Sequence, residues 1–111
     1  MNRKPLHLKK DRDRLAAHLP DPDQWIRGSL REAYLNCGRA QCRCHRAKRY
    51  RHGPYWYLSW TDSKGRTKSS LISPADLGRI RKGLNAYGKL WESICKISEI
   101  NVALIKSQGS R

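Results

Sequence analysis

The chain has 111 residues, of which 24 are Lys or Arg and 9 are Asp or Glu, so its formal net charge at pH 7 is +15. This length predicts one small domain with appendages, and a hydrophobic content of 38% without any Phe predicts a thin core built on Trp and Tyr. No run of about 18 apolar residues exists, which argues against a membrane-spanning helix and makes a cytoplasmic protein the expectation.

The charge is concentrated in the middle of the chain. Residues 27–73 hold eleven basic and two acidic side chains, a net charge of +9, against +2 for residues 1–26 and +4 for residues 74–111. Such an excess predicts a polyanionic partner, with nucleic acid favoured over an anionic lipid surface.

Residues 1–25 are polar and basic, and two interpretations stay open for them. A short helix from about His7 to Leu19 would place Leu8 and Leu15 partly on one face, and the Pro-Asp repeat that follows would end it. A disordered basic arm is the alternative, because the segment has few apolar side chains to bury.

Residues 26–36 are expected to form a strand in which Leu30 and Tyr34 share a face. A helix competes with this interpretation, because the same apolar residues also have helical spacing. Gly28 and Ser29 favour the strand.

Three of the four cysteines fall within the eight residues from Cys37 to Cys44, spaced as Cys-x4-Cys-x-Cys, and His45 and His52 follow. Zinc takes four ligands in a tetrahedron, and clustered thiolates and imidazoles supply them. Cys42 and Cys44 project to the same side of an extended segment, so both can face one ion. The residues leave the fourth ligand open between His52, His45 and a distant group.

Two alternatives to zinc stay open for these cysteines. Buried thiols can act as small hydrophobes, but the neighbours here are Arg, Gly and Gln. Disulfides suit a secreted domain, but residues 1–14 contain no apolar signal segment. Zinc is favoured, since a structural metal also stabilises a domain with little apolar surface to bury.

A β-hairpin is expected after the cysteine cluster. Pro54 opens its first strand, where a missing N–H is tolerated. Alternation then gives two faces, with Tyr55, Tyr57 and Ser59 on one and Trp56, Leu58 and Trp60 on the other. Residues 62–65, Asp-Ser-Lys-Gly, predict the turn, and residues 66–72 the returning strand.

A long C-terminal helix is expected within residues 74–111. Ser73 is the predicted cap, with Pro74 at the first helical position and Asp76 at the third, and the helix should end near Lys106.

The apolar pattern of this helix extends beyond what a small sheet can cover. Apolar residues recur at spacings of three and four from Leu77 to Leu104, which predicts packing on the hairpin first and a coiled-coil seam for self-association further along. Gly83 and Gly88 each weaken a helix by roughly 1 kcal/mol relative to Ala, which predicts a bend or break. Cys95 is expected to be a helix residue rather than a ligand.

The expected fold class is therefore α+β, a small zinc-knuckle sheet followed by a long C-terminal helix. The sheet is a hairpin or a three-stranded antiparallel sheet within residues 26–73. Residues 1–25 form the arm or short helix, and residues 74–111 form the long helix.

Four short motifs carry a resemblance to a known family: Gly28-Ser29-Leu30, Cys37-Gly38, Cys42-x-Cys44 and His52-Gly53-Pro54-Tyr55. The chain resembles, over about residues 27–107, an uncharacterised domain-of-unknown-function family of short bacterial and archaeal proteins. Many members lie in phages, plasmids and other mobile elements.

The resemblance implies a zinc site formed by Cys37, Cys42, Cys44 and His52, because His52 rather than His45 belongs to the family's motif. It implies a site and a fold rather than a function. The loop between the motifs is unusually basic in this chain.

The expected function is nucleic-acid binding around the metal. Basic residues bind phosphate, and Tyr55 and Tyr57 offer stacking platforms for unpaired bases. The expected basic ring comprises Arg39, Arg43, Arg46, Lys48, Arg49 and Arg51. The association with mobile elements favours DNA over RNA and suggests an accessory protein of such an element.

A protein-interaction adapter is the alternative function, in which the zinc is purely structural and the C-terminal helix dimerises or docks on a partner. An enzyme is not expected. A catalytic zinc needs an open position and a nearby acid or base, and the central region offers only Glu32 and Asp62.

Overall fold

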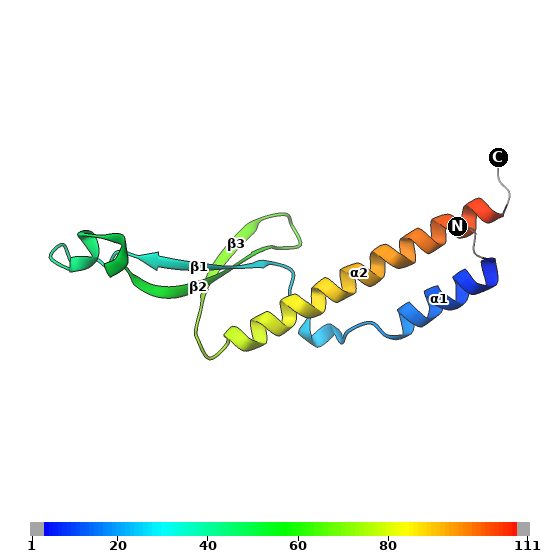
Figure 1. Cartoon of the computed structure of the whole chain (residues 1–111), viewed down its shortest axis with the longest axis horizontal. Coiled ribbons are helices and arrows are strands. Elements are labelled where there is room, and N and C mark those ends of the chain that lie inside the picture. The colour runs from blue at the N-terminus through cyan, green and yellow to red at the C-terminus, as the bar shows by residue number, and fades with distance from the viewer. Residues whose placement is uncertain (1–3, 109–111) are drawn as a thin grey trace. The chain divides into compact units, whose positions relative to one another are not determined.

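The computed structural model describes residues 4–108 (Figure 1). Helix α1 covers Pro5–Ala17, and the strands are β1 (Ser29–Leu35), β2 (His52–Thr61) and β3 (Thr67–Ile72), followed by helix α2 (Leu77–Ser107). The predicted α+β class, a three-stranded antiparallel sheet followed by a long C-terminal helix, is confirmed. Within the described range, no helix combines the length and the apolar character needed to cross a bilayer.

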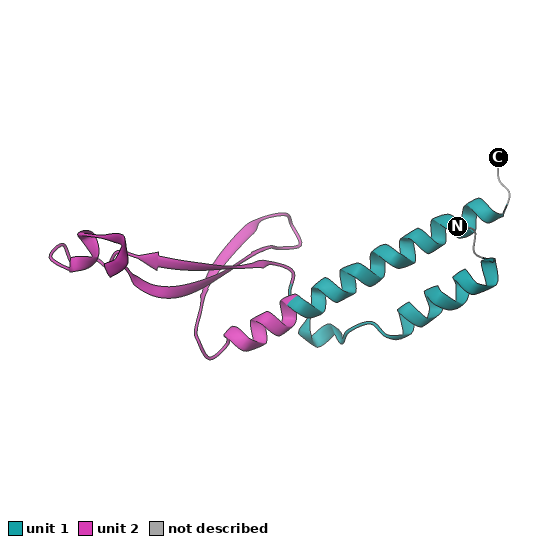
Figure 2. Ribbon diagram, in the orientation of Figure 1, with its two compact units in different colours: residues 1–26, 85–111 teal, residues 27–84 magenta. Residues whose placement is uncertain are grey.

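The chain divides into two compact units, which Figure 2 colours separately. The helical unit comprises residues 1–26 and 85–111, and the sheet unit comprises residues 27–84. Helix α2 contributes its first residues to the sheet unit and the remainder to the helical unit.

In the helical unit, α1 runs antiparallel beside the C-terminal part of α2 (Figure 2). Leu8 of α1 is buried, as are Leu90 and Leu104 of α2, and a guanidinium nitrogen of Arg12 donates to the Asn101 side-chain oxygen at 3.3 Å. The N-terminal segment is therefore a packed helix rather than a disordered arm. Burial of Leu8 stabilises α1, whereas Leu6 remains 61% exposed.

The sheet has the order β1-β2-β3, so β2 lies in the centre. Directly opposed residues of an antiparallel pair share a face, and the register defines two faces. The tryptophan face carries Leu30, Trp56, Leu58, Trp60 and Ile72, and the tyrosine face carries Arg31, Ala33, Tyr55, Tyr57 and Leu71. Both the strand predicted within residues 26–36 and the alternation predicted for β2 are confirmed.

The start of α2 lies over the tryptophan face, since the guanidinium of Arg81 stacks on the Trp56 ring at 4.8 Å. The helix begins at Leu77 rather than at Pro74, because Ser73–Asp76 form a turn closed by a backbone hydrogen bond of 3.0 Å. The Ser73 hydroxyl donates a hydrogen bond of 3.4 Å to the Asp76 carboxylate instead of accepting one from a helical N–H.

A bend or break was predicted at Gly83 and Gly88. Helix α2 is continuous from Leu77 to Ser107, so no break occurs there. Gly83 is buried. Gly88 is exposed, but Ala86 and Leu90 beside it are buried, and the burial of these neighbours offsets the unfavourable helix propensity of the two glycines.

Two glycines allow β1 and β2 to approach each other closely. A Cβ at Gly28 would lie 2.5 Å from the Ser59 carbonyl oxygen. A Cβ at Gly53 would lie 2.7 Å from the Ala33 carbonyl oxygen and 2.9 Å from the Tyr34 ring. Gly53 also has a φ of 145°, which side chains other than hydrogen rarely permit.

We expect Gly53→Ala to destabilise the fold by about 1–3 kcal/mol, because it combines an unfavourable φ with a clash against the β1 backbone. Gly38→Ala is the matched control, since a Cβ there meets no atom within 4 Å. Denaturant unfolding of the two metal-loaded variants measures the difference. Equal stability of both variants would show that Gly53 is not required at this position.

Candidate metal centre

The segment between β1 and β2, residues 36–51, is named the knuckle here. Two short 3-10 turns, Arg43–His45 and Lys48–Tyr50, organise it. Backbone N–H groups close the first part, from Cys42 to the Arg39 carbonyl at 3.2 Å and from His45 to the Cys42 carbonyl at 3.1 Å. The tight winding brings the cysteines of the knuckle towards the first residue of β2, His52.

Cys37, Cys42, Cys44 and His52 converge, and their ligand atoms all lie within 4.8 Å of one another. The sulfurs of Cys37 and Cys44 are 3.8 Å apart, and the sulfur of Cys42 lies 3.3 Å from Nε2 of His52. Metal bonds of about 2.3 Å to sulfur and 2.0 Å to nitrogen in a tetrahedron require separations of about 3.8 Å and 3.5 Å respectively. The arrangement is therefore compatible with one tetrahedrally coordinated metal ion.

Hydrogen bonds and burial shift the pKa values of two thiols of the knuckle in opposite directions. The Cys44 amide and then the His52 ring, by hydrogen bonding, lower the pKa of Cys42 to about 6. Burial raises the pKa of Cys44, whose side chain is buried and whose sulfur accepts the Cys37 N–H at 3.3 Å. Cys42 is thus largely a thiolate at neutral pH, whereas metal binding must displace a proton from Cys44.

His45 and Cys95 take other positions. Nε2 of His45 lies 3.1 Å from the Cys37 carbonyl oxygen, so this ring holds the backbone of a ligand residue instead of joining the cluster. Cys95 is an exposed residue of α2 in the helical unit. None of the four cysteines forms a disulfide.

The model of a family described as a domain of unknown function, DUF6788, matches residues 6–82. The chain belongs to this family. No curated protein and no solved structure matches the chain. The DUF6788 segment includes the sheet and all four clustered ligands, but it begins within α1 and ends early in α2. The expected span of residues 27–107 therefore started too late and extended too far.

The basic residues of the DUF6788 knuckle are all exposed, and none forms an ion pair within residues 4–108. Two of them share one aromatic ring: the guanidinium groups of Arg43 and Arg49 lie 4.8 Å and 4.7 Å from the centre of Tyr50. Sequence reasoning missed this role of Tyr50, although it is the one aromatic residue among the basic residues of the loop. Such contacts at exposed positions each contribute about 0.5–1 kcal/mol, so they favour a position of both cations near this ring.

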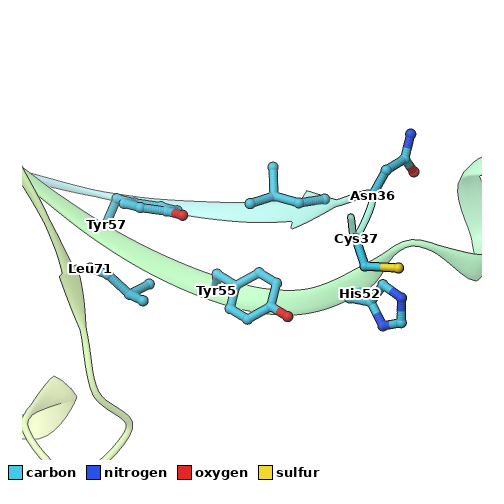
Figure 3. A pocket seen from close by; sticks show the side chains of 7 residues that line it. Asn36, Cys37, His52, Tyr55, Tyr57 and Leu71 are labelled. Carbon is cyan, nitrogen blue, oxygen red and sulfur yellow. The ribbon is translucent and has the colours of Figure 1, made fainter. Parts of the chain in front are cut away.

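The two tyrosines expected to stack on bases lie on the tyrosine face, beside the metal centre. Tyr55 is 38% exposed, whereas Tyr57 is half-buried and carries the Arg31 guanidinium 5.0 Å from its ring centre. A pocket of about 170 Å³ opens here (Figure 3). Its lining comprises the ligands Cys37 and His52 together with Leu35, Asn36, Tyr55, Tyr57 and Leu71.

We expect His52→Ala to lose tetrahedral binding of Co²⁺, a spectroscopic substitute for a metal in thiolate sites, because it removes the nitrogen ligand. His45→Ala should keep the tetrahedral spectrum and lose only about 10- to 100-fold in affinity, as for an outer hydrogen-bond partner. Titration of each metal-free variant with Co²⁺ measures both quantities. The reverse order of losses would assign the fourth ligand to His45.

Proposed function

We propose that this DUF6788 protein holds one structural zinc ion and uses the knuckle to bind the phosphate backbone of nucleic acid, DNA in preference to RNA. The exposed basic side chains of the knuckle support this proposal most strongly, because they form no ion pair among the described residues and are clustered between the proposed metal ligands. Arg and Lys bind phosphates, and release of the counterions condensed on the nucleic acid drives the association. A role in a mobile element remains a prediction from the family resemblance.

The charge of the sheet unit supports this proposal. Residues 27–84 hold fourteen basic and three acidic side chains, whereas the remaining residues hold ten and six. The net charge of +11 therefore lies in the unit that contains the metal centre. A ligand-fixed segment presents its cations at lower conformational cost than a flexible basic tail does.

The donor set favours zinc over other metals. Three thiolates and one imidazole are soft to borderline ligands, which suit zinc rather than magnesium, calcium or manganese. Four protein ligands close a tetrahedral shell, so we propose a structural rather than a catalytic ion.

We expect elemental analysis of the freshly purified chain to find one zinc per chain. Cys42→Ser should lose the metal and unfold the knuckle, because binding and folding are coupled at such sites. Cys95→Ser is the control and should keep one zinc. A wild-type protein without metal would contradict the proposal.

We expect the affinity for duplex DNA to fall with salt at about 0.9 log unit per log unit for each phosphate contact, or a slope near −3.6 for four contacts. The triple variant Arg46→Ala, Lys48→Ala and Arg49→Ala should make this slope less steep, by the amount expected for the loss of up to about three phosphate contacts. It should still retain its metal. Fluorescence anisotropy across a salt series measures the slope.

A control of equal charge separates contact from general electrostatics. The triple variant Lys9→Ala, Lys10→Ala and Lys96→Ala also removes three positive charges, but from exposed positions of the helical unit. It should leave the slope close to that of the wild type. Equal slopes for both triple variants and the wild type would exclude the knuckle as the contact surface.

A protein-interaction adapter is the second candidate, and the surface of α2 favours it. Large apolar side chains at helical spacing remain exposed on this helix, namely Trp91 at 54%, Ile94 at 41%, Val102 at 50% and Ile105 at 63%. Lys89, Glu92, Lys96 and Glu99 alternate in sign along the same stretch. An antiparallel second copy of α2 could therefore pair opposite charges while it covers the apolar stripe.

We expect the chain to self-associate at tens of micromolar, as measured by sedimentation velocity. Trp91→Ser and Ile105→Ser together should shift it to monomer, because they remove the two most exposed large apolar groups among Trp91, Ile94, Val102 and Ile105. Leu6→Ser, at an exposed site on α1, is the control. A monomeric wild type at that concentration would count against the second copy as the occupant.

A further inference from the structure

The pocket on the tyrosine face exposes apolar side chains that the fold itself does not use. Leu71 is 57% exposed, Leu35 is 42% exposed and Tyr55 is 38% exposed, all around the same opening. In a chain with so thin a core, these groups would add stability if they were buried. Their clustering beside the metal ligands indicates a surface that a ligand covers.

The size and walls of the pocket restrict the ligand to one flat ring system. Its volume of about 170 Å³ is below the 300–1,000 Å³ of sites for drug-sized molecules, so the pocket holds about one ring system and the rest of a larger ligand would lie outside it. Figure 3 shows the Tyr55 ring and Leu71 at its side, with His52 and Cys37 at its far end. An aromatic ring beside aliphatic walls suits stacking of a planar ligand.

Polar groups at the pocket match a nucleobase. Asn36 lines the opening and has an amide of the kind that reads base edges, although Figure 3 shows this amide turned away from the Tyr55 ring, so a change of its rotamer would be needed to reach a stacked base. Arg31, stacked on Tyr57, places a cation on the same sheet face. Tyr57 is thereby occupied, which makes Tyr55 the more available stacking ring.

We propose that this pocket binds one unpaired nucleobase, stacked on Tyr55, while the strand's phosphates extend to the cations of the knuckle. The inference rests on the proposed nucleic-acid binding and refines it from duplex to single-stranded or locally opened nucleic acid. The pocket and the knuckle lie in one unit and share Cys37 and His52. Bound metal would therefore hold both parts of the site in register.

Anisotropy with the full-length, zinc-loaded protein tests this proposal on three probes: a mixed-sequence single strand, the same strand with abasic positions, and the duplex. The abasic strand keeps its phosphates and leaves the protein unaltered. We expect wild-type affinity to be about 5- to 100-fold lower for the abasic strand than for the intact strand, as for loss of one stacked base. The salt slopes of the two strands should agree.

Tyr55→Leu should lower affinity for the intact strand by the same factor and leave the abasic strand and the duplex unchanged. Tyr34→Leu is the matched control, since Tyr34 is 48% exposed in the same sheet but does not line the pocket. It should behave as wild type.

Three outcomes would overturn the proposal. Equal wild-type affinity for intact and abasic strands excludes a base site, even if the knuckle variants still show phosphate binding. Equal losses in Tyr55→Leu and Tyr34→Leu exclude this pocket as the place of stacking. Failure of the wild type to bind any probe removes the proposed function itself, and this inference with it.

Discussion

The convergence of Cys37, Cys42, Cys44 and His52 is the constraint on which the sheet unit depends. Cys37 follows the end of β1 and His52 begins β2, so an ion bound there would join the two strands at the point where their pairing becomes irregular. The rest of this unit offers little to compensate for the loss of that link. Its buried side chains are small, and Leu58 is the one large apolar residue that is buried among residues 27–84.

The basic surface and the metal centre are two consequences of the same short loop. An unsupported loop with six cations would spread them apart, because like charges repel in a loop without acidic partners. In this chain the shared Tyr50 ring brings two of the cations, Arg43 and Arg49, close to one another, and two tight turns shape the loop. The energetic cost of this repulsion fits a surface that meets a polyanion, since binding would relieve it.

Features set by neighbouring residues could be predicted from the sequence, and features set by distant residues could not. The alternation of β2, the turn at Asp62 and the spacing of the cysteines are local patterns, and each matched the structure. The packing of α1 depends on α2, about ninety residues later, so the sequence could not decide between helix and disorder. The continuity of α2 through Gly83 and Gly88 likewise depends on packing that helix propensity does not describe.

The same distinction between local and distant residues applies to the candidate metal site. The cysteine spacing alone indicated three ligands, and the family resemblance favoured His52 as the fourth. The structure adds the reason, because the winding of the knuckle turns His45 towards the Cys37 carbonyl and brings His52 to the cysteines. The pocket was not foreseen, because Leu35 and Leu71 come from the two edge strands and Asn36 from the start of the knuckle, and only the folded sheet places them beside Tyr55.

The order of the four ligands along the chain has a consequence for how the protein is made. Three sulfur ligands leave the ribosome within an eight-residue segment, before His52 and before either strand of the hairpin. Thiolates are soft ligands that suit zinc, and three of them are present before the fourth ligand is made. If the cluster binds an ion, the three thiolates could hold it before β2 has paired with β1. His52 would then complete the shell as the strand pairs, so that the last coordination bond and the first contacts of the sheet form in one step.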